Sequence, residues 1–310
     1  MPGVDLDFRK LKTVSLRRRR HLVKLEAFGR PSAGGSTAAF VDSLPDILAG
    51  KRLKRLVAAL RTGRAGGRAL VWALGAHVLK CGLAPYLIRL MEQGFITRLA
   101  LNGAGLVHDF ELAYCGETSE DVAESLADGS FGTAEETGLF LGQVLGVAAG
   151  GTEGLGTAAG RLMVEQALPH RAHSVLARGF ELGVPVTIHA ALGADVVHIH
   201  PACDWQQLGA LLRRDFESFA GGLPGLAGGG VYLNVGSAVL LPEVFLKALS
   251  LVRNLGHEVA GFTAANLDMM EHYRPRVNVL ERPGGEALQL TGHHELLVPL
   301  LAGALLEPNP

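Results

Sequence analysis

The segment Arg68–Gly103, RALVWALGAHVLKCGLAPYLIRLMEQGFITRLALNG, decides the expected fold of this chain. Its first part, RALVWALG, is a short apolar run that is typical of a buried strand. Pro85 then stands in the first turn of a helical stretch and Gly94 just past its end, which is the usual punctuation of a helix. FITRLALNG follows as a second strand. Strand, helix and strand in this order predict a βαβ unit with parallel strands.

The same alternation recurs after a helical block at about residues 133–182. That block contains a small-residue run, Gly146–Gly160, which fits either close helix packing or a loop. Further strands are expected at 184–190, 194–200, 230–236, 258–266, 276–282 and 287–292. Because several of these runs are apolar throughout, they predict a parallel sheet with helices on both faces. The expected fold class is therefore α/β, a doubly wound, mainly parallel Rossmann-like sheet.

Composition and charge limit the classes of partner. The 310 residues are 48% hydrophobic, and 29 Lys and Arg balance 30 Asp and Glu, so a global basic field for nucleic acid is absent. No apolar run reaches the roughly 18 residues that a membrane helix needs, and the start of the chain lacks a signal-peptide core. We therefore expect no nucleic acid and no membrane as partners. Three widely spaced cysteines, Cys81, Cys115 and Cys203, do not suggest a disulfide framework and favour a cytoplasmic protein.

The first 45 residues differ from the rest of the chain. They lack clear periodicity and are rich in small and turn residues near their end, so we expect an irregular N-terminal arm over 1–45 and a single α/β domain over 46–310. Arg17–Arg20 is a run of four arginines within the arm. Such a run fits a solvated arm, a subunit contact or a patch for nucleic acid or an anionic ligand.

Polar turns follow the expected strands, where a doubly wound sheet binds its ligands. Asn102–Gly105 (NGAG) and Asn234–Ser237 (NVGS) contain glycines that let backbone approach a ligand, and a helix start offers N–H groups to phosphate. Neither turn is the six-residue dinucleotide fingerprint, and each also fits a plain strand-to-helix connection. From these turns we expect Gly236 and Ser237 to contact a nucleotide.

Seven of the 12 histidines fall at expected strand ends, and as a group they offer proton transfer near neutral pH. They are His77, His108, His189, His198, His200, His293 and His294. In an expected strand at 194–200, His198 and His200 share one face, with His189 one strand away. Three imidazoles suit zinc with an open position, although each histidine alone fits a structural role equally well. Lys80 lies in an expected strand-end loop, where it fits a base, an imine-forming lysine or an ordinary surface lysine.

Three stretches together resemble deoxyhypusine synthase in the order of their strands, turns and helices. They are Val71–Val122, Gly183–Pro201 and Leu290–Leu306. The resemblance implies a Rossmann-like fold, a homotetramer with sites at subunit interfaces, bound NAD, and transfer of the aminobutyl group of spermidine through an enzyme lysine. By position, it implies that NAD is approached by Gly75, Asn102, Gly103, Ala104, Gly105, Asp109 and Asp195. We add His77 and His293 to these cofactor candidates because they stand at strand ends.

The departures from that family change the expected chemistry. The stretch that matches the segment of the family's catalytic lysine, 266–285, contains no lysine. The family's Lys-His-His becomes Val239–Leu241, its acidic pair becomes Val107 and His108, and its late Ala-Asp-Ala turn becomes Gly292–His294. The acidic pocket for a polycation is therefore expected to be largely lost, and only Lys80 remains to form an imine.

We expect a deoxyhypusine synthase-like protein that binds NAD or a related nucleotide across the turns after Leu74 and Leu101. It would act in redox or group-transfer chemistry on an unidentified small molecule, as a homo-oligomer, and not as a true deoxyhypusine synthase. The catalytic candidates are His108, His198 and His200 as acid–base groups, Lys80 as a base or imine-forming group, and Asp109 as a carboxylate that orients a histidine. Two alternatives remain open: a metal-dependent hydrolase built on His189, His198 and His200, and a ligand-binding protein without catalysis.

Overall fold

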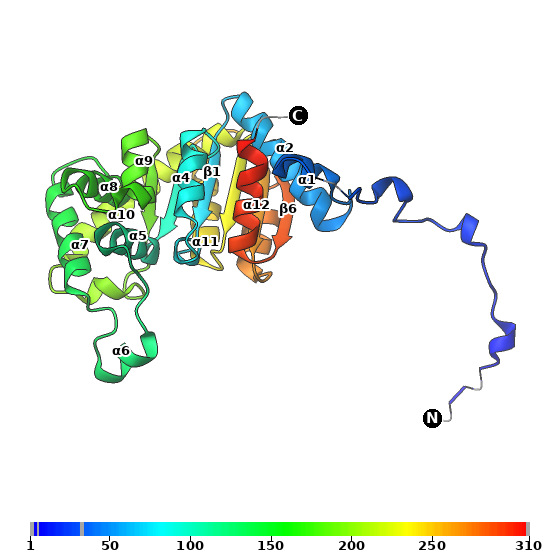
Figure 1. Cartoon of the computed structure of the whole chain (residues 1–310), viewed down its shortest axis with the longest axis horizontal. Helices are drawn as coiled ribbons and strands as arrows, with labels where there is room; N and C mark the ends of the chain where they lie inside the picture. Colours follow the sequence, from blue (N-terminus) through cyan, green and yellow to red (C-terminus); the bar gives the residue numbers. More distant parts are fainter. Residues whose placement is uncertain (1–2, 5, 32–33, 308–310) are drawn as a thin grey trace.

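The computed structural model describes residues 3–4, 6–31 and 34–307, and its centre is one sheet of six parallel strands (Figure 1). The order of the strands across the sheet is β3-β2-β1-β4-β5-β6. Their bounds are β1 Leu70–Leu74, β2 Arg98–Asn102, β3 Val186–His189, β4 Val231–Val235, β5 Thr263–Asp268 and β6 Glu286–Thr291. The expected doubly wound, parallel α/β fold is confirmed.

The strand order creates a topological switch point between β1 and β4. The chain builds outward from β1 to β3, then returns to place β4 on the other side of β1. The connections on the two sides leave in opposite directions, and parallel sheets of this kind usually bind ligands at the carboxyl ends of the strands at such a point. Gly75 follows β1 and Gly236 follows β4, and a Cβ placed on Gly75 would lie 2.1 Å from the carbonyl oxygen of Gly236. The backbones can meet here only because residue 75 has no side chain.

Helices cover both faces of the sheet, and alternate strand residues divide the core between them. Leu70, Trp72 and Leu74 of β1 belong to the larger core, with α2, α4 and α12, while Val71 and Ala73 belong to a smaller core with α11. Figure 1 shows α4 and α12 crossing in front of the sheet. The described α-helices are α1 Thr37–Ser43, α2 Leu48–Ala65, α3 His77–Lys80, α4 Ala84–Glu92, α5 Gly103–Cys115, α6 Val122–Asp128, α7 Glu135–Ala148, α8 Leu155–Glu165, α9 Val175–Leu182, α10 Trp205–Gly222, α11 Leu240–Asn254 and α12 His294–Leu306.

Two of the expected strands are wrong. Residues 194–200 contain a 3-10 turn, Val196–Ile199, and residues 276–282 fall in a π-helical segment, Pro275–Glu281. Both runs contain β-branched residues at strand-like spacing, which explains the error. However, each run has a proline next to it, Pro201 after the first run and Pro275 before the second. Proline has no backbone N–H to donate to the hydrogen bonds of a strand ladder.

Residues 6–31 extend away from the sheet (Figure 1). Residues 6–31 form three single 3-10 turns, at Phe8–Lys10, Leu16–Arg18 and Leu25–Ala27, and none of these turns buries a residue. The helix α1 lies within residues 1–45 but packs against α12 of the domain. Among the described helices, none is long and apolar enough to cross a membrane.

Candidate functional site

The polar turn after β2 starts α5 and makes room for an acid. The side-chain oxygen of Asn102 accepts a hydrogen bond from the Gly105 amide at 3.0 Å, so Asn102 caps the helix. A Cβ placed on Gly103 would lie 2.3 Å from a carboxylate oxygen of Asp195. Gly103 is therefore required by the close approach of Asp195, and this turn positions the loop that carries that acid.

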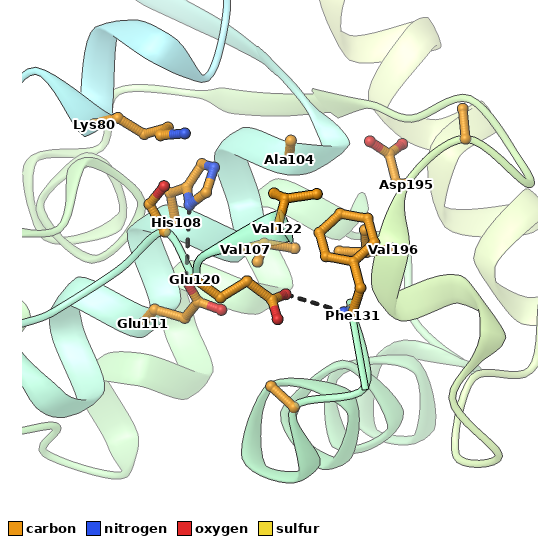
Figure 2. A pocket seen from close by; sticks show the side chains of 14 residues that line it. Lys80, Ala104, Val107, His108, Glu111, Glu120, Val122, Phe131, Asp195 and Val196 are labelled. Carbon is orange, nitrogen blue, oxygen red and sulfur yellow. Dashed lines mark hydrogen bonds and ion pairs between the residues drawn. The ribbon is translucent and has the colours of Figure 1, made fainter. Parts of the chain in front are cut away.

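A cavity of about 200 Å³ opens beside the first turns of α5 (Figure 2). Its walls come from the end of α3, from α5, from the two segments that flank α6, and from the loop after β3. It brings together four of the residues expected at the site: Lys80, Ala104, His108 and Asp195. The other lining residues are Val107, Glu111, Ser119, Glu120, Val122, Phe131, Gly132, Ala134, Ala194 and Val196.

The cavity has an excess of negative charge. Three carboxylates line it, those of Glu111, Glu120 and Asp195, together with a single lysine, Lys80. Glu120 accepts from the Gly132 amide at 3.0 Å, and Asp195 accepts from the Ala191 amide at 3.0 Å. No lysine or arginine in the described part of the chain forms an ion pair with any of the three. The sequence predicted that the acidic pocket for a polycation would be largely lost, yet loops far apart in sequence supply three acids to this cavity.

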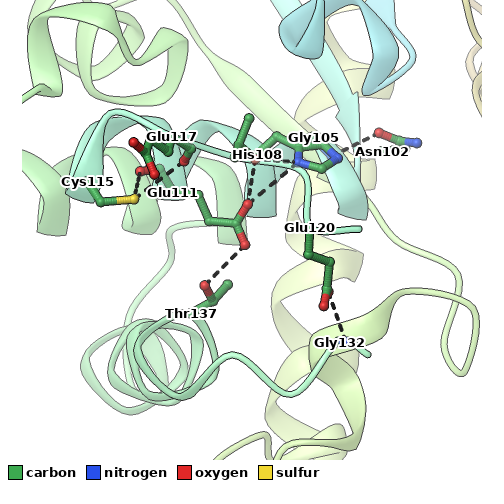
Figure 3. A network of polar contacts seen from close by, with 10 residues as sticks. Asn102, Gly105, His108, Glu111, Cys115, Glu117, Glu120, Gly132 and Thr137 are labelled. Carbon is green, nitrogen blue, oxygen red and sulfur yellow. Dashed lines mark hydrogen bonds and ion pairs between the residues drawn. The ribbon is translucent and has the colours of Figure 1, made fainter. Parts of the chain in front are cut away.

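A hydrogen-bonded network joins His108 to Glu111 on the wall of this cavity (Figure 3). Nδ1 of His108 lies 2.7 Å from the hydroxyl oxygen of Thr118, and that hydroxyl donates to Oε2 of Glu111 at 2.5 Å. Burial acts to raise the pKa of the Glu111 carboxyl, but the hydrogen bonds from His108 and Thr118 outweigh it and lower the pKa. Since the Thr118 proton goes to Glu111, Nδ1 of His108 is the donor to Thr118. When the ring is neutral, Nε2 is then the acceptor, which suits a general base.

A second set of polar groups lies at the switch point, beyond β4 and β5. The side-chain nitrogen Nδ2 of Asn234 donates to Oδ1 of Asn266 at 2.8 Å and to the backbone carbonyl of Ser237 at 2.9 Å. Gly236 has a φ of +69°, and a Cβ placed there would lie 2.9 Å from the His294 ring. Nε2 of His294 is 3.8 Å from Oδ1 of Asp268, and burial is the main cause that lowers the pKa of this histidine.

Four buried polar atoms in this region have no hydrogen-bond partner among the described residues. They are Oδ1 of Asn234, Oδ2 of Asp268 and both ring nitrogens of His294, whose side chain is only 1% exposed. A buried polar atom without a partner costs roughly 1–3 kcal/mol. Such atoms gathered at one point are typical of a place that water or a ligand fills.

Other expected cofactor contacts surround the switch point in different roles. Nε2 of His77 lies 3.3 Å from the Cys81 thiol, and its ring centroid is 5.8 Å from that of His294. The Ser237 hydroxyl accepts from the Leu241 amide at 3.2 Å and so supports the start of α11. His293 is exposed at the start of α12.

The structure places Asp109 away from the cavity. Its buried carboxylate accepts hydrogen bonds from the Ser174 hydroxyl at 2.5 Å and from the amides of Val175 and Leu176 at 2.8 and 3.0 Å. Burial raises its pKa to about 6, although these hydrogen bonds act against the shift. Asp109 therefore caps α9, and the expectation that it orients a histidine or approaches NAD does not fit its position.

His189, His198 and His200 are not brought together either. His189 ends β3 with Nε2 at 3.0 Å from the Thr187 hydroxyl, and burial lowers its pKa to about 4. His198 is buried in the 3-10 turn, and the ring of His200 packs under Gly138 of α7. Among the described residues, no group of three or more His, Cys, Asp or Glu side chains is close enough to hold a metal ion.

Sequence reasoning missed Glu120, Asp268 and Asn266 as site residues. Asp268 and Asn266 stand at the end of β5, so the rule that places ligands beyond strand ends could have found them. Glu120 lies just before α6, where an acid is usually explained by the helix start. Only its position in space relates it to the cavity.

The comparisons with known proteins agree with the fold. No protein-family profile matches this chain, and no curated protein matches it at a significant level. The solved structures include AgrE in a ternary complex with ornithine and NAD+ (TM-score 0.54, 18% identity, 84% of this chain and 34% of that chain). They also include an LOR/SDH protein from Methanococcus maripaludis S2, with a TM-score of 0.53 and 14% identity over 84% of this chain and 70% of that chain.

A third solved structure carries the resemblance seen in the sequence. It is a proposed deoxyhypusine synthase from Entamoeba histolytica, with a TM-score of 0.54 and 11% identity over 88% of this chain and 94% of that chain. The chain spans about a third of the length of AgrE. At these identities the likeness concerns the fold. The chain therefore has the fold of the deoxyhypusine synthase-like proteins, which it resembles distantly.

Proposed function

We propose that this protein binds NAD or a related nucleotide at the switch point and catalyses redox or group-transfer chemistry on a small-molecule amine. The observation that carries the proposal is the coincidence of two features. The strand order reverses between β1 and β4, and four buried polar atoms without a hydrogen-bond partner among the described residues lie near this switch point. A likeness to AgrE, whose structure holds ornithine and NAD+, supports the same pair of ligands.

The polar groups at the switch point fit the sugar portion of a nucleotide. Ribose hydroxyls donate hydrogen bonds, and Oδ1 of Asn234 and Oδ2 of Asp268 are acceptors without a donor. His294 can donate from one ring nitrogen and accept at the other. Gly75 and Gly236 add no side chain to this edge of the sheet. Bound NAD+ would supply a hydride acceptor, and these residues would hold and orient it.

The acidic cavity fits the substrate. An ammonium group is attracted by the carboxylates of Glu111, Glu120 and Asp195, and the apolar walls include Val107 and Phe131, which suit an aliphatic body. His108 presents the acceptor nitrogen that removal of a proton from the ammonium requires. Lys80 is the one lysine that lines the cavity, and it is our candidate for a base or an imine-forming group.

The nucleotide part is tested by titrating the whole protein with NAD+ in a calorimeter. We expect saturable binding, and we expect Asp268→Asn and His294→Gln each to weaken it by about tenfold, since each removes one hydrogen bond worth about 1–1.5 kcal/mol. Asp42→Asn is the matched control, because Asp42 is exposed and outside both sites. Absence of binding by the unaltered protein at about millimolar NAD+ would exclude the nucleotide site.

The amine part is tested with 1,4-diaminobutane as the probe. We expect the double variant Glu120→Gln/Asp195→Asn to weaken binding by about tenfold or more, because two charges are removed from a partly buried site. Glu258→Gln changes an exposed acid that forms no ion pair and serves as control. If the double variant binds the diamine as tightly as the unaltered protein does, the carboxylates do not recognise an amine.

A further inference from the structure

We propose that a second cavity, next to the acidic one, binds a small organic anion, a carboxylate or a phosphate ester with a short apolar body. This cavity has a volume of about 400 Å³ and lies between the α3–α4 turn, the end of α5 and the segment before α9. Its lining residues are Leu79, Lys80, Gly82, Ala84, Pro85, Leu112, Gly116, Thr118, His170 and His173.

The charge of this cavity is opposite to that of its neighbour. No acidic side chain is among its lining residues, whereas Lys80, His170 and His173 supply one amine and two imidazoles. Within the described ranges, none of these three side chains has a hydrogen bond or an ion pair with another side chain. Three nitrogen-bearing groups that converge without a carboxylate leave their donors for an anion from solution.

The backbone holds the two histidines on one side of the cavity. The amide of His170 donates to the carbonyl of Ala113 at the end of α5, and the amide of His173 donates to the carbonyl of His170, each at 2.9 Å. These bonds fix the 3-10 turn Arg171–His173 against α5. Gly116 has a φ of +79°, and a Cβ placed on it would lie 3.3 Å from Nε2 of His170. Because Gly116 has no side chain, the ring of His170 can lie against it at the edge of the cavity.

The remaining walls decide the kind of anion. Leu79, Ala84, Pro85 and Leu112 give one side an apolar surface, which a free inorganic ion would not use. A pocket of this volume with mostly apolar walls and a few polar groups is typical of sites for small organic molecules. The ligand class that matches both sides has one anionic head and a short aliphatic body.

This site is a separate cavity from the acidic one, and the two share only Lys80 among their lining residues. The ligand can be a carboxylate or a phosphate ester, and comparing the affinities of one probe from each class distinguishes the two. Lys80 is left unchanged in the variants, so that a loss of anion binding cannot arise from damage to the acidic cavity.

The experiment titrates the whole protein with butyrate, butyl phosphate and inorganic phosphate by calorimetry. We expect one saturable site, with butyrate or butyl phosphate binding at least about tenfold more tightly than inorganic phosphate because of the apolar wall. The double variant His170→Gln/His173→Gln should weaken that binding by about tenfold. Both rings are exposed, so the variant should fold normally, and the matched control is His21→Gln/His257→Gln, which removes two exposed histidines elsewhere.

Each outcome is decisive. Tighter binding of butyl phosphate than of butyrate identifies a phosphate-ester site, and the reverse identifies a carboxylate site. The proposal is overturned if no probe saturates at about 10 mM, if inorganic phosphate binds as tightly as either organic anion, or if the His170/His173 variant binds like the control variant.

Discussion

Replacing Asp215 with alanine is expected to lower the free energy of unfolding by about 3 kcal/mol or more. The carboxylate is carried by α10 and is only 1% exposed. Its Oδ2 accepts hydrogen bonds from the amides of Gly156 at 3.0 Å and Ile188 at 2.9 Å, and the amide of Leu155 also donates to the carboxylate. Alanine would leave three buried amides without acceptors, at about 1 kcal/mol or more for each. One side chain thus connects α10, the start of α8 and β3.

The variant Asp215→Asn separates hydrogen bonding from charge. Its single carbonyl oxygen can still accept from both Gly156 and Ile188, so we expect a smaller loss, about 1–2 kcal/mol. Burial raises the pKa of Asp215 to about 7 from an ordinary value of 3.8, although its backbone hydrogen bonds act against the shift. Between these two values the folded protein keeps the proton and the unfolded chain has lost it. The stability contributed by this group is therefore lost as the pH rises from about 4 to about 7.

The measurement is urea unfolding of the unaltered protein and of Asp215→Asn at several pH values between about 5 and 8. Asp109 and His189 titrate in both proteins, so the difference between the two curves isolates Asp215. We expect the unaltered protein to lose stability relative to the variant as the pH rises. A difference that does not change with pH would show that Asp215 is not protonated in the folded state over this range. Asp42→Ala, at an exposed position, provides the control for the alanine variant.

The variant Gly156→Ala is expected to cost about 3 kcal/mol, at the upper end of the usual range for overpacking. Gly156 lies in the first turn of α8, where a Cβ would lie 2.1 Å from the carbonyl oxygen of Val186 and 3.2 Å from Cα of Thr187. These neighbours are backbone atoms of β3, which pairs with β2 and cannot move without breaking the ladder. The helix must therefore move away from the sheet.

Gly209→Ala supplies the matched control for this effect. Gly209 lies within α10, and a Cβ placed there would meet no atom within 4 Å. Because alanine restricts the unfolded chain more than glycine does, this variant should gain roughly 0.5–1 kcal/mol. Both variants can be compared by thermal and urea unfolding. Equal and small effects at the two positions would show that α8 is not held as closely to β3 as the structure places it.

Much of the fold can be predicted from the sequence, because the elements that build it have local signals. The strand, helix and strand of Arg68–Gly103 appear as β1, α4 and β2, with Pro85 and Gly94 at the helix boundaries as expected. The two strands that were wrong, at 194–200 and 276–282, have the right local pattern but no neighbour in the sheet. Strand propensity alone does not report whether a partner strand exists.

The candidate site was only partly predictable. Lys80, His108 and Asp195 were expected at the site and line the acidic cavity. Glu120 was missed because it lies between α5 and α6, in a segment that only the tertiary structure brings to the cavity. Asp109 was placed wrongly for a different physical reason. A side chain on α5 points either into the cavity or into the core, and that choice depends on the helix's rotation about its own axis. His108 and Asp109 are adjacent in sequence, yet the first lines the cavity and the second caps α9.

The sequence by itself determined the class of the fold and the parallel sheet, and it predicts that ligands bind beyond the carboxyl ends of the strands. These follow from apolar periodicity and from turn residues, which act over a few positions of the chain. Only the tertiary structure decided which polar groups share a cavity, which carboxylates serve as helix caps, and where buried acceptors remain without donors. Those properties depend on contacts between segments more than a hundred residues apart in the sequence, such as α3 and the loop after β3, and no local pattern encodes them.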